Sequence, residues 1–120
     1  MSYEQLIDAY CEAWGERQAS TRTAQLETVL TETGRYTDPR ADLVGPEALS
    51  AHIGTVLAAR PGSRVIRTTA VDQHHRFVRF GFRVIGANGT QLLDGVDVAE
   101  ITAEGRLARI IGFFGELAET

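Results

Sequence analysis

The start of the chain repeats its apolar side chains at the spacing of an α-helix. Ser2 followed by Gln5 has the form of a capping box, in which two side chains bond the free backbone groups of a helix start. We therefore expect the first helix to run to about Arg17. One face of this helix collects the apolar residues Tyr3, Leu6, Ile7, Tyr10, Cys11 and Trp14.

Two further helices are predicted in the first half of the chain. Apolar residues before position 30 mark a short second helix, which Gly34 is expected to end because glycine accepts the conformation that follows a helix. Residues 35–37 then extend as a short strand, followed by a loop. Proline at the first helical position loses no hydrogen bond, so a third helix is expected from Gly45-Pro46 to Pro61-Gly62.

From Arg64 onward the pattern is that of β-strands, with many β-branched and aromatic residues. Asn88-Gly89 favours a tight hairpin because both residues tolerate a positive φ, and Glu104-Gly105 marks a second turn. The sequence therefore predicts three or four long antiparallel strands, connected in order, within residues 64–72, 76–86, 90–101 and 106–117.

These elements predict one α+β domain over residues 1–120, with three N-terminal helices packed on one face of an antiparallel sheet. Gly81, Gly95 and Gly112 lie inside the strands, where glycine permits kinks and bulges. We therefore expect a strongly curved sheet that forms a conical barrel around the first helix and encloses an internal pocket.

Charge and composition narrow the classes of function. The chain has 16 acidic and 12 basic residues, a net charge of -4 and no basic run, so nucleic acid is not an expected partner. No signal-peptide pattern and no apolar run of membrane-spanning length is present, so we expect a cytoplasmic protein without a membrane partner. Cys11 is the single cysteine, which excludes an internal disulfide.

The histidines do not predict a metal site. His74-His75 falls where a turn between strands is expected, and no third ligand supports the pair at metal-binding spacing. His52 lies on the third predicted helix, where it either borders the pocket as an alternative base or is an ordinary, partly buried histidine. The chain has no phosphate loop or dinucleotide fingerprint, so we expect chemistry without a cofactor.

Several stretches, taken in order, resemble one known superfamily over essentially the whole chain. They resemble the nuclear transport factor 2-like superfamily, in particular its SnoaL-like and ketosteroid isomerase-like members. This resemblance implies a cystatin-like α+β fold with an internal pocket, and a homodimer formed through the sheet face. The stretches are "YCEAW" (10–14), "YTDP" (36–39), "VGPEALSAHI" (44–53), "DGVDVAEI" (94–101) and "GRLARIIGFFGE" (105–116).

The resemblance to ketosteroid isomerases implies a role for individual residues. Asp38, which precedes a proline, matches the general base, and Asp97 matches the protonated acid of the oxyanion hole by its spacing from the closing "FGE". Tyr10 is the best match to the tyrosine donor of that family, whereas Trp14, one turn later, could donate its indole N–H instead. Such groups would remove a proton next to a carbonyl and stabilise the enolate oxygen.

The residues alone leave alternatives for both acids. Asp38 before a proline also fits a simple Asx turn. Asp97 lies in the middle of a strand among apolar neighbours, so it is in a pocket, paired with an arginine such as Arg79, or on an exposed strand face. Asp94 is out of phase with Asp97 and faces the other way. We expect the pocket wall to include Trp14, Tyr36, His52, Phe80, Phe82 and one of Phe113 and Phe114.

Three functions fit these observations. The first is a cofactor-free isomerase acting on a small hydrophobic carbonyl compound, such as a steroid or a polyketide-like ring. The second is a cyclase, dehydratase or hydrolase that uses the same pocket, and the third is a non-catalytic module for ligand binding or dimerisation. Phe77, Ile85 and Ile101 are expected to be exposed on the outer sheet face, which favours a homodimer through that face.

Overall fold

A computed structural model describes residues 1–120 and contains three helices and seven strands. The helices are α1 (Tyr3–Ala13), α2 (Ala19–Val29) and α3 (Pro46–Ala59). The strands are β1 (Leu30–Asp38), β2 (Ala41–Val44), β3 (Arg64–Arg67), β4 (Asp72–His74), β5 (Phe77–Ile85), β6 (Gln91–Ile101) and β7 (Leu107–Phe114).

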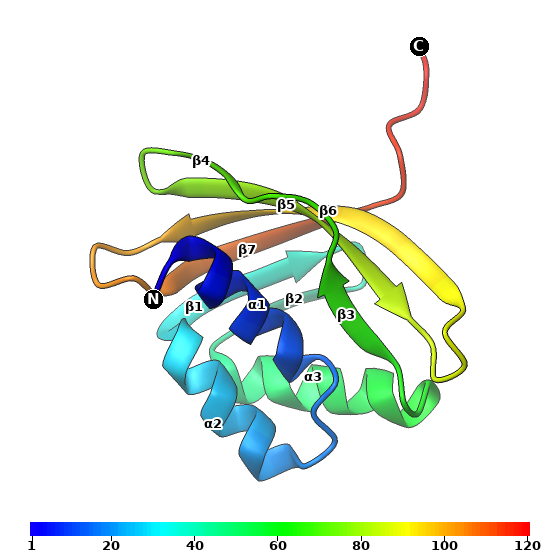
Figure 1. Ribbon diagram of the computed structural model, residues 1–120. Coiled ribbons are helices and arrows are strands. Elements are labelled where there is room, and N and C mark those ends of the chain that lie inside the picture. Colours follow the sequence, from blue (N-terminus) through cyan, green and yellow to red (C-terminus); the bar gives the residue numbers. More distant parts are fainter.

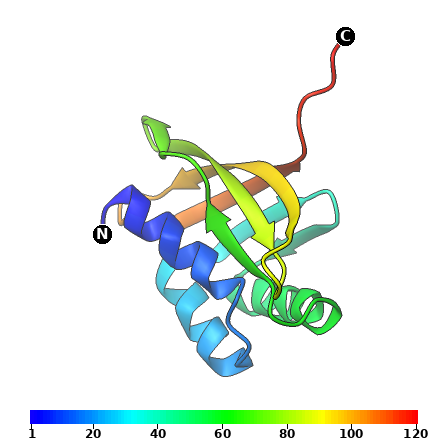
Figure 2. The same ribbon diagram turned by 45° about the vertical axis from the view of Figure 1, so that its right-hand side comes forward.

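All seven strands belong to one curved sheet, and the three helices lie on one side of it (Figure 1). The strand order is β2-β1-β7-β6-β5-β3, with β4 paired to β5. The view in Figure 2 shows α1 lying within the curve of the sheet, next to β3 and α2. The predicted α+β class, with three helices on a strongly curved sheet, is confirmed.

Two details of the predicted sheet are wrong. The sheet is mixed, because β1 pairs with β7 in parallel while every other pair is antiparallel. It is also open, since β2 and β3 are edge strands and no pairing joins them into a barrel. Local hairpin signals report only pairs of consecutive strands, so they could not reveal this pairing between residues 74–77 positions apart.

The first helix begins as predicted and ends four residues early. The capping box of Ser2 and Gln5 is complete, with side-chain to backbone distances of 2.8 and 3.1 Å. The helix ends at Ala13, and the chain then turns toward α2. In this connection the carbonyl of Glu16 accepts a hydrogen bond from Nη1 of Arg22 at 2.7 Å. The second helix starts at Ala19, earlier than its apolar residues suggest.

Gly34 does not end a helix but lies inside β1, which starts directly after α2. The pairing of β1 with β7 shifts register between Leu30 and Arg35, and a Cβ on Gly34 would lie only 2.5 Å from Cδ1 of Leu30. A bulge, rather than a helix end, thus requires this glycine. The predicted loop after it contains β2, whose Asp42 forms an ion pair with Arg35 at 2.6 Å.

The outer sheet face differs from its prediction. Phe77 is exposed as expected, but Ile85 and Ile101 are buried. A register shift after Val84 turns Ile85 inward, and Ile101 has the same phase along β6 as Asp97, so both face the helices. Two further apolar side chains exposed on this face are those of the cross-strand neighbours Val96 and Phe113. The homodimer stays a prediction.

None of the three helices has the length and apolar character needed to cross a membrane. A cytoplasmic location stays a prediction. The interior is one apolar cluster between the helices and the sheet, and it contains Leu6, Ile7, Tyr10, Leu26, Leu49, Ile53, Ile101, Leu107 and Ile110.

Candidate functional site

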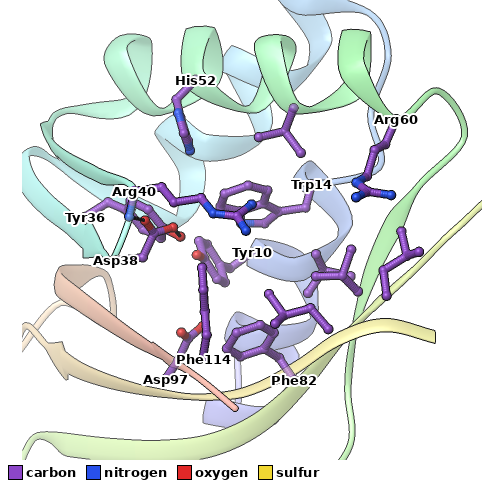
Figure 3. A pocket seen from close by; sticks show the side chains of 15 residues that line it. Tyr10, Trp14, Tyr36, Asp38, Arg40, His52, Arg60, Phe82, Asp97 and Phe114 are labelled. Carbon is purple, nitrogen blue, oxygen red and sulfur yellow. Dashed lines mark hydrogen bonds between the residues drawn. The ribbon is translucent and has the colours of Figure 1, made fainter.

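A cavity of about 170 Å³ opens between α1, α3 and the strands, and most of its wall is apolar (Figure 3). It brings together side chains from both ends of the chain, because β7 inserts between β1 and β6. The lining residues are Tyr10, Trp14, Tyr36, Asp38, Arg40, His52, Val56, Arg60, Val65, Phe82, Val84, Leu92, Leu93, Asp97 and Phe114.

Asp38 is both a turn former and a cavity residue. It is the last residue of β1, and its Oδ1 accepts a hydrogen bond from the backbone N–H of Arg40 at 2.7 Å, which closes an Asx turn. Its Oδ2 accepts a hydrogen bond from the hydroxyl of Tyr36, two residues earlier on the same face of the strand. Both oxygens therefore act as acceptors, the role that a carboxylate plays.

Tyr36 supports Asp38 from a nearly buried position, with 5% of the residue exposed. Burial, followed by the hydrogen bond to Asp38, raises the pKa of Tyr36 far above its usual value. The hydroxyl therefore stays protonated near neutral pH and can donate this hydrogen bond.

Asp97 lies in the middle of β6 and is only 6% exposed. No arginine pairs with it, because Arg79 points to the other face of the sheet and forms an ion pair with Asp72 at 2.7 Å. Burial, and then the negative charge of Asp38, raises the pKa of Asp97 to about 7. Of the alternatives for this residue, the pocket position is correct. Near neutral pH its carboxyl group carries a proton in a large fraction of molecules and can donate a hydrogen bond.

Gly112 allows the two acids to approach one another. Its position in β7 pairs with Asp97, and a Cβ built there would lie 2.8 Å from Oδ1 of Asp97 and 3.5 Å from Cβ of Asp38. The acids therefore flank one small space that no side chain from β7 fills. The negative charge of Asp38 is consequently close enough to raise the pKa of Asp97.

Tyr10 and Trp14, which the sequence offered as alternatives, both line the cavity. Tyr10 is 2% exposed, and burial, followed by the charge of Asp97, raises its pKa well above the usual value, so its hydroxyl stays protonated. Trp14 forms an aromatic wall with Tyr36 and His52, at ring-centroid distances of 5.6 and 6.0 Å. His52 therefore borders the pocket, which is one of the two positions that the sequence left open for it.

Of the predicted phenylalanines, Phe82 and Phe114 line the cavity, whereas Phe80 and Phe113 do not. Phe80 faces inward beside Asp97 but is buried in the core cluster. Phe113 alternates with Phe114 along β7 and is 61% exposed on the outer face. The ring of Phe82 lies over Gly95, where a Cβ would approach it to 2.4 Å.

Sequence reasoning missed several cavity residues. Val56 was recognisable from its place on the apolar face of the third helix. Arg40, two residues after the end of β1, and Arg60, directly after α3, gave no periodic signal. His74 is the last residue of β4 and His75 begins the β4–β5 turn, so only His75 lies in the turn predicted for the pair, and neither residue lines the cavity. No group of three histidine, cysteine, aspartate or glutamate side chains is close enough together to hold a metal ion.

Comparison with known proteins gives a consistent assignment. The family model of the SnoaL-like domain matches residues 7–110. A crystal structure of a candidate isomerase of the SnoaL-like family from Agrobacterium tumefaciens superposes with a TM-score of 0.88 and 28% sequence identity, covering 97% of this chain and 100% of that one.

Two more distant structures share the fold. A candidate SnoaL-like polyketide cyclase from Jannaschia has a TM-score of 0.68 and 14% identity, covering 92% of this chain and 85% of that chain. A nuclear transport factor 2-like protein from Exiguobacterium has a TM-score of 0.73 and 14% identity, covering 93% and 99%. No functionally curated protein matches the chain in sequence. Because the family model spans most of the chain, the protein belongs to the SnoaL-like domain family.

Proposed function

We propose that this protein is a cofactor-free enzyme that moves a proton next to a carbonyl group in a small hydrophobic substrate. The observation that supports the proposal is one apolar cavity lined by two carboxyl groups in unlike environments and by a tyrosine hydroxyl. Asp38 accepts two hydrogen bonds, whereas Asp97 is buried and has a pKa raised to about 7. Acid and base chemistry at neutral pH needs such a difference between two carboxyl groups.

In the proposed mechanism, Asp38 removes a proton from the carbon next to the carbonyl group. The electron pair of the broken C–H bond forms the enolate, and its oxygen accepts hydrogen bonds from the protonated Asp97 and from Tyr10. Asp38 then returns the same proton to a different carbon of the conjugated system. No proton or electron is gained or lost overall, so the step is an isomerisation.

Related structures support this class of chemistry and one alternative. The relative from Agrobacterium tumefaciens is named as a candidate isomerase, and the one from Jannaschia as a candidate polyketide cyclase. In a cyclase the same base would form an enolate that attacks a second carbonyl group within the substrate. The unfilled cavity favours both enzymatic functions over a module used for dimerisation alone.

The test is isomerisation of a single-ring β,γ-unsaturated ketone, cyclohex-3-en-1-one, to its conjugated isomer, followed by ultraviolet absorbance. Asp38→Asn is expected to lower kcat by about 10²–10⁴-fold, the usual contribution of a general base, with little change in KM. Asp94→Asn is the matched control, because Asp94 is exposed on the other face of β6 and paired with Arg83. Equal turnover by the wild type and Asp38→Asn would refute the role of Asp38.

A further inference from the structure

Two arginines at the mouth of the cavity have no acidic partner. Arg40 follows the end of β1, and Arg60 caps the C-terminus of α3; both are exposed and both line the cavity. Figure 3 shows their guanidinium groups directed over the cavity from two sides. All ion pairs of the chain use other arginines, namely Arg35, Arg67, Arg79 and Arg83.

The position of Arg40 leaves it free to bind an anion. Its Cζ lies 5.6 Å from the centroid of the Phe114 ring, so the guanidinium group is held over an aromatic face at the mouth. A guanidinium group in this arrangement keeps N–H groups at its edge that can bond the two oxygens of a carboxylate. Eight of the 12 arginines form no ion pair, but Arg40 and Arg60 are the two arginines that line the cavity.

The size of the cavity limits how much of a substrate it can enclose. An apolar cavity of about 150 Å³ holds one benzene molecule. The cavity here, of about 170 Å³, therefore encloses about one ring. Any larger substrate must extend outward through the mouth, where it passes between Arg40 and Arg60.

We propose that the substrate is an amphipathic carboxylate: a hydrophobic ring bearing the reacting carbonyl group lies inside, and a carboxylate at the end of a short chain binds Arg40 and Arg60. This proposal rests on the proposed function only in taking the same cavity as the substrate site. It names a class of substrate, which the two acids and the aromatic wall do not specify by themselves.

Binding of two matched probes tests the proposal without requiring turnover. The probes are 4-phenylbutanoate and its uncharged amide, 4-phenylbutanamide, and the signal is fluorescence of Trp14, the only tryptophan of the chain and a cavity residue. The wild type is expected to bind the carboxylate at least about fivefold more tightly than the amide. Arg40→Gln and Arg60→Gln should each weaken carboxylate binding about two- to fivefold, as for exposed ion pairs, and leave amide binding unchanged.

Arg76→Gln is the matched control, because Arg76 is an exposed arginine in the β4–β5 turn, outside the cavity lining. It should bind both probes as the wild type does. Equal affinity of the wild type for the two probes, no saturable signal with either, or equal losses in Arg76→Gln and the two mouth variants would overturn the proposal. A carboxylate preference without ketone isomerisation would refute only the proposed function, and active isomerisation without that preference would refute only this inference.

Discussion

The side chains of Asp38 and Asp97 both approach Gly112, a residue of β7, the strand that lies between β1 and β6. A methyl group at Gly112 would lie 2.8 Å from Oδ1 of Asp97, closer than carbon and oxygen atoms normally approach. The missing side chain therefore lets two acids line one cavity, and it makes the pKa of Asp97 sensitive to the charge of Asp38.

Gly112→Ala should disturb this arrangement. The added methyl group forces the Asp97 carboxyl group aside, so we expect turnover to fall at least about tenfold and the free energy of unfolding to fall by about 1–3 kcal/mol, as for other overpacked sites. Ketone isomerisation and urea denaturation measure the two effects. Gly86→Ala is the control, since its new Cβ would meet neighbouring atoms at 3.4 Å or more. Equal behaviour of the two variants would contradict the proposed contact.

Asp97 should make stability depend on pH. Its pKa is raised to about 7 in the folded chain, whereas an unfolded aspartate titrates near 3.9. Between these values the folded chain holds a proton that the unfolded chain releases, so this contribution is complete below about pH 4 and is lost as the pH rises to about 7. The total loss is up to about 4 kcal/mol.

Asp97→Asn has no such titration. The free energy of unfolding of this variant, relative to that of the wild type, should therefore rise as the pH increases from 4 to 8. Urea denaturation of both proteins at several pH values measures the difference, and comparing the two cancels the effects of other acids with shifted pKa values, such as Asp42. A difference that stays constant with pH would show that Asp97 titrates normally in the folded chain.

Much of the fold could be predicted from short-range signals. The Ser2–Gln5 capping box and the Gly45-Pro46 helix start each act within a few residues, and the structure contains both. The hairpin at Asn88-Gly89 is also present, but its loop covers residues 86–90 and only Gly89 has a positive φ, so the turn is wider than predicted. Gly34 was misread because glycine serves equally at a helix end and at a bulge. Only pairing with β7, which the local sequence does not encode, decides between the two.

Residues of the site could be predicted where the alternation of side chains along a strand, or the family resemblance, indicated them. Other choices between neighbouring residues could not be made from the sequence. Phe113 and Phe114 are both apolar, so alternation could not say which faces inward until the register of β7 was known. Phe80 and Phe82 both face the helices, but Phe80 is buried in the core cluster and only Phe82 reaches the cavity. Such choices depend on side chains that are distant in sequence.

Tyr36→Phe should reveal how far the hydroxyl of Tyr36 supports the base. The variant keeps the ring and removes the hydrogen bond to Oδ2 of Asp38, so the carboxylate loses one of its two donors. We expect kcat to fall about tenfold with little change in KM, and stability to fall by about 1.5–3 kcal/mol, the usual contribution of a hydrogen bond to a charged group. Tyr3→Phe, at a tyrosine outside the cavity lining, is the control. If kcat is unchanged, Tyr36 is a wall residue only.

Arg22 should be a main determinant of stability rather than of chemistry. It is 4% exposed and has no acidic partner, but its Nε donates to the carbonyl and hydroxyl oxygens of Ser50, and its Nη1 donates to the carbonyl oxygen of Glu16. It thereby joins the α1–α2 connection to α3, the helix that carries His52. Arg22→Met fills a similar volume but leaves buried oxygens without donors, so we expect a loss of about 3 kcal/mol. Thermal and urea denaturation measure it, with Arg17→Met, an exposed position, expected to change stability by less than about 0.5 kcal/mol. Equal stabilities of the two variants would show that the buried guanidinium group contributes nothing beyond its packing.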